Sequence, residues 1–212
     1  MHPNPIFHDA DETLNFDFAR ERGFGTLAIN GSDGPILSHV PFLLNEQNDI
    51  AELHLLRSNP IARELKTPQT AKIAVSGGDT YVSPDWYGVA DQVPTWNYVV
   101  VHLAGALELR PQEELHDLLD RQSAAYEDRL VPKPPWTTGK MTKDVMHKMM
   151  RKIVPCRMKI ASVDGTWKLN QNKPDDVRLR AAEHVEGFGF GSETAVLAAL
   201  MRGVRPSGRG SL

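Results

Sequence analysis

The sequence is poor in cysteine, contains no long apolar run and carries no large excess of either charge. Cys156 is the only cysteine among 212 residues, which excludes an intrachain disulfide and a zinc site built from several thiolates. The chain has 24 lysines and arginines against 27 acidic residues, so it lacks the basic excess of many nucleic-acid-binding proteins. No apolar run could span a bilayer, and residues 1–16 lack the features of a signal peptide. We therefore expect a soluble, cytoplasmic protein.

The rest of the composition is typical of a folded globular protein. Hydrophobic residues make up 41% and charged residues 24% of the chain, and 212 residues can bury a sizeable core. We expect one domain over residues 1–202 with a helical C-terminal part, followed by a disordered tail over residues 203–212.

Short β-type segments dominate the first half of the chain. After a helix expected at Thr13–Arg22, residues 26–29 and 36–44 flank the sequence NGSDG. Its Asn-Gly and Asp-Gly pairs favour the positive φ angles of a hairpin turn. Residues 51–58 predict a third strand, and a proline at position 60 predicts the start of a short helix over residues 60–66.

Glycines suggest interruptions in the β-type segments that follow. Residues 70–84 predict two strands broken at Gly77-Gly78, and residues 153–173 predict further β structure with a turn at Val163-Asp164-Gly165. Helices are expected at residues 111–126, 141–151, 175–185 and 192–202. Closely spaced strands with few long crossovers favour a mainly β (α+β) fold, an antiparallel barrel with peripheral helices.

The longest expected strand, Trp96–Leu109, has two unlike faces. Its odd positions are almost purely apolar and should line the barrel interior: Asn97, Val99, Val101, Leu103, Gly105, Leu107 and Leu109. The first four even positions are Trp96, Tyr98, Val100 and His102, so three of the four carry an aromatic or imidazole ring. Aromatic and imidazole side chains are unusual on a solvated face, so something should cover it. Two covers remain open: a subunit interface or packed helix, and a flat aromatic ligand edged by Tyr98 and His102.

Several familiar site motifs are missing. No GxGxxG or Walker-type loop occurs, which removes the two commonest nucleotide motifs but not nucleotide binding itself. The eight histidines form neither HExxH nor a pair spaced four residues apart, so we predict no metal site. Cys156 follows a proline in a β-type run and is expected to be a small buried residue.

Four long motifs of this chain occur in the order and spacing of one family. They are GTLAINGSDGPILSHVPFLL, HLLRSNPIARELK, TYVSPDWYGVADQVPTWNYVVVHLAGALEL and WKLNQNK. From about Phe7 to about Leu200 the chain resembles the PaiB-type FMN-binding negative transcriptional regulators, relatives of the pyridoxamine-phosphate-oxidase-like split-barrel flavoproteins. One departure is Asn170, where the family pattern has Ser. The resemblance implies a homodimer of split β-barrels with FMN between the subunits, and a regulatory role in some bacteria.

The resemblance assigns the FMN phosphate to the segment RSNPIARELK. Arg57, Ser58 and Asn59 precede the expected short helix, and Arg63 and Lys66 lie on it, so cations, a hydroxyl and free backbone N–H groups come together. A solvated helix face is the alternative for the two later cations.

The resemblance also names contacts for the rest of the cofactor. These are His39, Val40, Pro41, Ser83, Trp86, Trp96, Asn97, Tyr98, His102, Lys168, Gln171 and Asn172. Ser38 and His39 alternate on their strand, so at most one should meet the ligand. The amides after Lys168 can pair with the ring carbonyls and N3–H. A buried, hydrogen-bonded histidine is the alternative for His39.

Several functions remain open at this point. The resemblance favours a flavin-dependent regulator or sensor, and the alternatives are an NAD(P)H-dependent flavin oxidoreductase, a haem-binding split barrel and a dimerising barrel without a ligand. Residues 140–152 place five cations in one helical segment, which could contact DNA but more often forms a solvated face.

Overall fold

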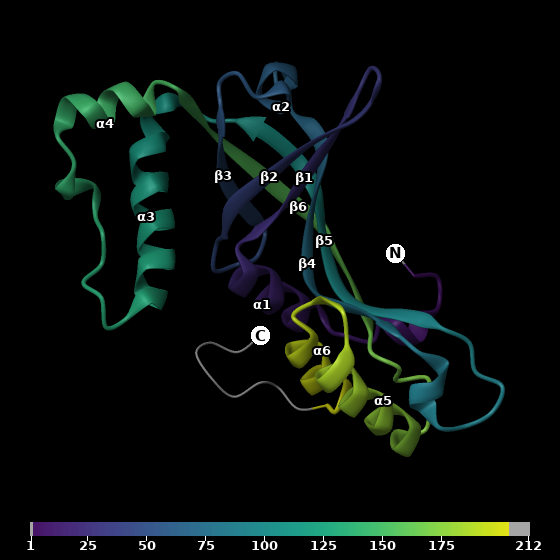
Figure 1. Cartoon of the computed structure of the whole chain (residues 1–212). Coiled ribbons are helices and arrows are strands. Elements are labelled where there is room, and N and C mark those ends of the chain that lie inside the picture. The colour runs from purple at the N-terminus through teal and green to yellow at the C-terminus, as the bar shows by residue number, and fades with distance from the viewer. Residues whose placement is uncertain (1, 204–212) are drawn as a thin grey trace. The chain divides into compact units, whose positions relative to one another are not determined.

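The structure is a computed structural model that describes residues 2–203 (Figure 1). Apart from Gly203, the expected C-terminal tail lies outside the described residues. The α-helices are α1 (Glu12–Arg22), α2 (Pro60–Glu64), α3 (Leu115–Glu127), α4 (Lys143–Met150), α5 (Asp175–Phe188) and α6 (Thr194–Met201). The strands are β1 (Phe24–Gly31), β2 (Gly34–Leu44), β3 (Ile50–Leu56), β4 (Gln69–Val82), β5 (Thr95–Leu109), β6 (Ile153–Lys168) and β7 (Gly191–Ser192). Short 3-10 helices include η1 (Pro5–Phe7), η2 (Pro84–Tyr87) and η3 (Gln112–Glu114).

Over residues 2–203 the strands form one sheet that closes on itself. Its order is β1-β2-β3-β6-β5-β4-β7, and β1 also pairs with β4. This extra pairing joins the ends of a six-stranded ring and leaves only β7 outside it. The pairs β1–β2, β2–β3, β3–β6 and β4–β7 are antiparallel. The expected mainly β fold, a split antiparallel barrel with peripheral helices, is confirmed.

The chain folds as two compact units. The terminal unit comprises Met1–Arg22, Ala74–His102 and Val163–Leu212, and the central unit comprises Gly23–Ile73 and Leu103–Ser162. Since β4, β5 and β6 contribute residues to both units, each of these strands serves two separate sets of packing contacts.

The central unit is built around the β1–β2 hairpin and α3. The predicted hairpin is confirmed, with Gly31 paired to Gly34 across a two-residue turn of Ser32 and Asp33. Of the predicted loop NGSDG only Gly34 has a positive φ (124°). The hydroxyl of Tyr126 on α3 lies within hydrogen-bond distance of the carbonyl oxygens of Gly23 (2.6 Å) and Phe42 (3.1 Å), and donating its one hydrogen to either ties the helix to the hairpin. On the same helix Arg121 pairs with Glu52 of β3 at 2.6 Å. Cys156 is buried as expected, and burial raises the pKa of its thiol to about 12.

The terminal unit packs α1, α5 and α6 beside its strands. Figure 1 shows α5 and α6 side by side at one end of this unit, and their buried residues include Val177, Val185 and Leu197. Phe18 of α1 makes an edge contact with Trp167 of β6, with 5.4 Å between the ring centroids.

The expected break at Gly77-Gly78 is wrong, because β4 runs unbroken from Gln69 to Val82. Both glycines lie where other elements approach the strand closely. A Cβ on Gly77 would lie 2.9 Å from the Phe18 ring, and one on Gly78 would lie 3.0 Å from the Glu193 carbonyl oxygen. The glycines thus make room for packing and do not turn the chain.

The expected turn at Val163-Asp164-Gly165 is also wrong, because β6 continues from Ile153 to Lys168. A Cβ on Gly165 would overlap the side-chain oxygen of Asn15, so this glycine admits Asn15 of α1 against the strand.

Candidate functional site

The two faces of β5 differ as the alternation predicted. Val101, Leu103 and Leu107 are fully buried, and the only strongly exposed odd-position side chain is Leu109 at the end of the strand (39% exposed). Trp96 on the other face is 41% exposed, and the Tyr98 and His102 side chains are half-buried. His102 is engaged within the chain. The even face is therefore only partly covered by the chain itself.

Asn97 does not lie on this open face. Its side chain is fully buried, and its Nδ2 donates to Met201 Sδ of α6 at 3.4 Å. Its Oδ1 has no hydrogen-bond partner in the described part of the chain. The structure thus places the predicted contact Asn97 in the interior of the terminal unit.

Trp96 belongs to a group of aromatic residues on the terminal unit. Its Nε1 donates to Asp79 Oδ1 of β4 at 3.1 Å, and its ring lies 6.3 Å from Tyr81 and 5.8 Å from Phe190. Sequence reasoning missed Tyr81 and Phe190 as members of this group. The repeated Phe-Gly pairs of residues 187–191 were the available signal, because they leave large rings on a segment without a core pattern.

The segment before β5 is rigidly capped. Ser83 accepts a hydrogen bond from the Asp85 N–H at 3.3 Å and so begins η2. Trp86 stacks on His184 of α5, with ring centroids 5.8 Å apart and planes 19° from parallel. Both predicted contacts are half-buried, and their side chains already have partners within the terminal unit.

Lys168 lies at the end of β6, beside the start of β5. Its Nζ donates to Thr95 Oγ1 at 2.6 Å and lies 5.9 Å from the centroid of the Phe7 ring. Burial lowers the pKa of Lys168, and no carboxylate within residues 2–203 pairs with it. A half-buried ammonium group without a counter-ion can bind an anion.

The residues after Lys168 form a tight turn. Gln171 accepts from the Leu169 N–H at 2.8 Å and donates to the carbonyl oxygens of Ile6 (3.1 Å) and Trp167 (2.5 Å), so its amide is committed to this turn. Asn172 is exposed. Asn170 has φ of 62°, a left-handed conformation that Asn tolerates better than Ser, which explains why Asn suits this position.

In the central unit, two of the predicted phosphate contacts have structural partners. Arg57 donates to the Arg151 carbonyl oxygen (2.8 Å) and to Gln112 Oε1 (2.5 Å), and Asn59 caps α2 by accepting from the Ile61 N–H at 2.9 Å. Asn59 Nδ2 also donates to Ser38 Oγ at 3.0 Å, which places β2 beside the start of α2.

The other three predicted phosphate contacts are open to solvent. Ser58, Arg63 and Lys66 are exposed, and their side chains form no hydrogen bond or ion pair with any residue between 2 and 203. Together with Asn59 we call these residues the basic surface. It offers two cations, one hydroxyl and one amide.

The predicted contacts on β2 alternate between the two faces of the strand, one buried and one exposed. Val40 is 2% exposed and faces the core, Pro41 is half-buried, and His39 is exposed on the opposite side from Val40. The His39 ring stacks against Phe24, with centroids 6.5 Å apart and planes 23° from parallel. The alternative, a buried and hydrogen-bonded His39, is therefore wrong.

Two further kinds of feature are absent from the described residues. Between residues 2 and 203 no three His, Cys, Asp or Glu side chains gather in a way that could hold a metal ion. In the same range no helix is both long and apolar enough to cross a membrane.

Comparison with known proteins identifies the family. Residues 1–162 match the family model described as "Putative FMN-binding domain". The chain belongs to this FMN-binding family. A curated relative, protease synthase and sporulation protein PAI 2 of Bacillus subtilis, is 26% identical over 180 residues, which cover 84% of each chain. The family that the four motifs indicated is therefore confirmed, and so is FMN as its cofactor.

Solved structures share the fold at low sequence identity. The FAD and heme binding protein from Mycobacterium smegmatis is 17% identical with a TM-score of 0.57, over 88% of this chain and 82% of that chain. The flavocytochrome Anf3 from Azotobacter vinelandii is 14% identical with a TM-score of 0.58, over 83% of this chain and 77% of that chain.

The residues present fit the chemistry of FMN. Its dianionic phosphate needs cations and hydrogen-bond donors, and Ser58, Arg63 and Lys66 of the basic surface offer them without partners among residues 2–203. Its flat ring needs an exposed aromatic or apolar face, which Trp96 and Tyr98 on β5 offer in the terminal unit.

Proposed function

We propose that this protein is a flavin-dependent transcriptional regulator or sensor that works as a homodimer with FMN as its resident cofactor. The observation that carries the proposal is the asymmetry of β5, whose odd face is buried while Trp96, Tyr98 and His102 remain partly open. In an FMN-binding family, a cofactor and a second subunit are the two natural covers for such a face.

The basic surface is the proposed anchor for the FMN phosphate. Arg63 and Lys66 supply positive charge, while the Ser58 hydroxyl can donate a hydrogen bond. Asn59 keeps this segment in place through its cap and its bond to Ser38. Arg57 has a supporting role, because its guanidinium already holds Arg151 and Gln112. His39 and Pro41 on the neighbouring strand are the proposed further contacts.

In the terminal unit, Trp96, Tyr98 and His102 are the proposed ring contacts. Bound FMN would supply a ring that accepts and donates electrons. The chain's own part is to orient that ring and to keep water from one of its faces. Lys168, Ser83, Trp86 and Asn172 remain proposed contacts, and Gln171 acts through the turn that it holds together.

The regulatory part of the proposal draws on PAI 2 and on α4. The name of PAI 2 links that protein to protease synthesis and sporulation. On and next to α4, Lys143, Lys148, Arg151 and Lys152 are exposed, and none of them pairs with a carboxylate within residues 2–203. This helix is the proposed contact with DNA phosphates.

The deciding experiment is the absorption spectrum of protein purified without added cofactor. We expect flavin bands, or their appearance after FMN is added and the excess removed. A haem Soret band, or no uptake of FMN, would contradict the proposal. Mixing the yellow protein with NADH or NADPH then tests the oxidoreductase alternative, and we expect the flavin colour to persist.

A gel shift with DNA at low and moderate salt tests the regulatory part. We expect binding that weakens steeply as salt rises, because phosphate contacts release counter-ions. The variant Lys148→Ala/Arg151→Ala should bind more weakly, whereas Lys72→Ala, an exposed lysine on β4, should bind normally. Equal binding by all three proteins would exclude α4 as the contact.

A further inference from the structure

Three aromatic side chains from distant parts of the sequence meet on the terminal unit. They are Tyr81 of β4, Trp96 of β5 and Phe190 just before β7, and we call them the aromatic cluster. The Tyr81 and Phe190 rings lie 5.8 Å apart and only 19° from parallel. Trp96 stands edge-on to both, at 66° to Tyr81 and 81° to Phe190. The cluster thus presents two nearly parallel rings beside one upright ring.

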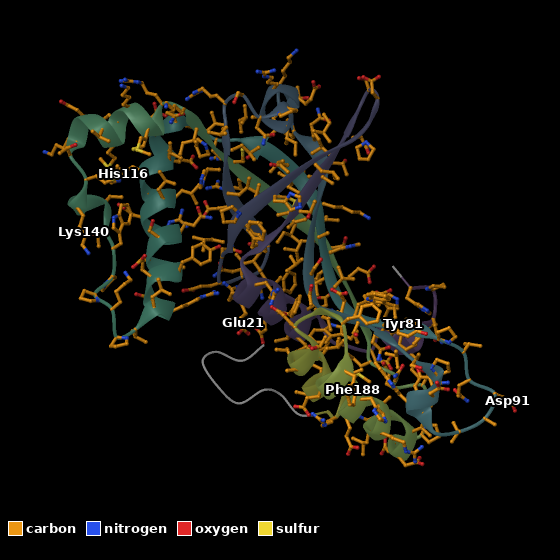
Figure 2. All side chains as sticks on the ribbon, in the orientation of Figure 1. Glu21, Tyr81, Asp91, His116, Lys140 and Phe188 are labelled. Carbon is orange, nitrogen blue, oxygen red and sulfur yellow. The ribbon has the colours of Figure 1, made fainter. Side chains whose placement is uncertain are left out.

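Two of these rings are open to solvent. Phe190 is 61% exposed and Trp96 is 41% exposed. Leaving large apolar surface in water forgoes the hydrophobic stabilisation that burial would give, and contiguous exposed apolar residues commonly mark binding surfaces. Tyr81 and the nearby Phe188 are labelled in Figure 2 and mark this region of the terminal unit.

The backbone around Phe190 is held in place despite the exposure of the ring. Thr80 Oγ1 donates to the Phe190 carbonyl oxygen at 2.8 Å, and β7 pairs with Asp79 and Thr80 of β4. Gly191 has φ of 139°, and a Cβ there would collide with the Asp79 carbonyl oxygen. Arg22 then clamps Glu193 through two hydrogen bonds of 2.6 and 2.9 Å. The exposed ring is therefore preorganised, which lowers the entropic cost of binding.

The polar group beside the rings narrows the class of ligand. Asp79 Oδ1 accepts from Trp96 Nε1 at 3.1 Å, which fixes the indole and leaves the second carboxylate oxygen free to accept from a ligand N–H. A purely apolar partner would bury the second oxygen of this carboxylate without a donor, at a cost in free energy. A flat ligand ring that carries an N–H at one edge can pack against the aromatic cluster and donate a hydrogen bond to Asp79.

We infer that the aromatic cluster is a binding platform for the isoalloxazine ring of a flavin. Phe190 and Trp96 contact the ring, Asp79 accepts from its N–H edge, and β7 holds Phe190 in position. This inference rests on the proposed FMN binding and extends it to Tyr81, Asp79 and Phe190, three residues that are not among the predicted contacts. Trp96 and Tyr98 share one face of β5, so the platform continues the open face of that strand.

The test uses riboflavin, which has the ring but no phosphate. Full-length apoprotein is titrated into riboflavin, and quenching of flavin fluorescence gives the affinity. Phe190→Ala should weaken binding about 2- to 12-fold, the range expected for one aromatic contact. Phe190→Tyr keeps a ring and should bind like the original protein. Phe188→Ala is the matched control, because Phe188 is 74% exposed on the same segment but outside the cluster.

Each outcome has a separate meaning. If the original protein binds FMN and riboflavin while Phe190→Ala binds riboflavin equally well, the platform is overturned and the proposed function stands. Equal losses in Phe188→Ala and Phe190→Ala also overturn it. If Phe190→Ala changes only the oligomeric state on size-exclusion chromatography, the cluster is an interface between copies. If the original protein binds no flavin, both the proposed function and the platform fail.

Discussion

Trp167 of β6 donates its indole N–H to Asn15 Oδ1 of α1 at 2.8 Å, beside the strand position where Gly165 has no side chain. Both side chains are at least nine-tenths buried, with Asn15 5% and Trp167 6% exposed. The bond therefore joins the first helix to the last long strand inside the terminal unit. It depends on a glycine that sequence patterns assign to a turn.

Gly165→Ala should destabilise the protein by about 3 kcal/mol, because the new methyl group must displace Asn15 and weaken a buried hydrogen bond. Urea unfolding followed by circular dichroism measures the change. Gly187→Ala is the control. Gly187 lies in α5 with open space around its Cα, so alanine there should stabilise by about 0.5 kcal/mol. Equal stability of both variants would show that Gly165 is not required for this packing.

Arg63→Ala and Lys66→Ala should each weaken FMN binding about 10-fold while leaving riboflavin binding unchanged, because they remove charge opposite the phosphate. The loss should shrink as salt rises. Lys72→Ala removes an exposed cation elsewhere in the central unit and is the matched control. If FMN affinity falls instead in Lys168→Ala and not in the first two variants, the phosphate anchor lies at Lys168 of the terminal unit.

Local signals were enough to predict most strands and helices. The Asn-Gly and Asp-Gly pairs predicted the β1–β2 hairpin, and the strict alternation over Trp96–Leu109 predicted which face of β5 is buried. The breaks predicted at Gly77 and Gly165 were wrong, because these glycines leave room for a helix that packs against the strands from a distant part of the sequence. A local pattern cannot separate a glycine that bends the chain from one that admits a neighbour.

The candidate site was predictable only in part, for the same reason. Motif resemblance gave the segment 57–66 and the β5 residues, and the family match confirms the cofactor class. The motif resemblance did not reveal that the Asn97 side chain faces α6. It also did not reveal that the Gln171 side-chain amide already forms hydrogen bonds within its own turn. Nor could it find Phe190, whose partners Tyr81 and Trp96 lie about a hundred residues earlier in the chain.

His8 should stabilise the N-terminal segment more when it is protonated than when it is neutral. Its Nδ1 contacts Asp164 Oδ1 at 3.1 Å and its Nε2 contacts the His2 carbonyl oxygen at 2.5 Å, so both nitrogens face acceptors and the imidazolium form satisfies both. The bond to the His2 carbonyl, helped by Asp164, raises the pKa of His8 above 6.5. The contribution to stability is therefore complete below pH 6.5 and is lost as the pH rises through the raised pKa.

NMR titration of the histidine ring protons checks this assignment. Asp164→Asn should lower the pKa of His8, since it removes one of the groups that favour the charged ring. His116→Gln is a control, because His116 lies on α3 in the central unit. A His8 pKa at or below the ordinary value in the original protein would contradict the charged state.

His54 should have the opposite pH dependence. It lies on β3 against α3, and its Nδ1 is buried without a hydrogen-bond partner in the described part of the chain. Burial lowers the pKa of His54, and a hydrogen bond with Gln122 opposes the shift only in part. The native state therefore holds fewer protons on this residue than the unfolded chain does. Its contribution to stability falls as the pH drops below 6.5 toward the lowered pKa.

The variant His54→Leu isolates this effect. It cannot be protonated, so its stability should fall less steeply with acid than that of the original protein, whatever its stability at neutral pH. Urea unfolding at a series of pH values between neutral and mildly acidic measures both curves. Glu52 of β3, Arg121 of α3 and Arg157 of β6 are charged groups on the elements around His54, and they remain in both proteins. Parallel curves would show that His54 does not titrate on unfolding.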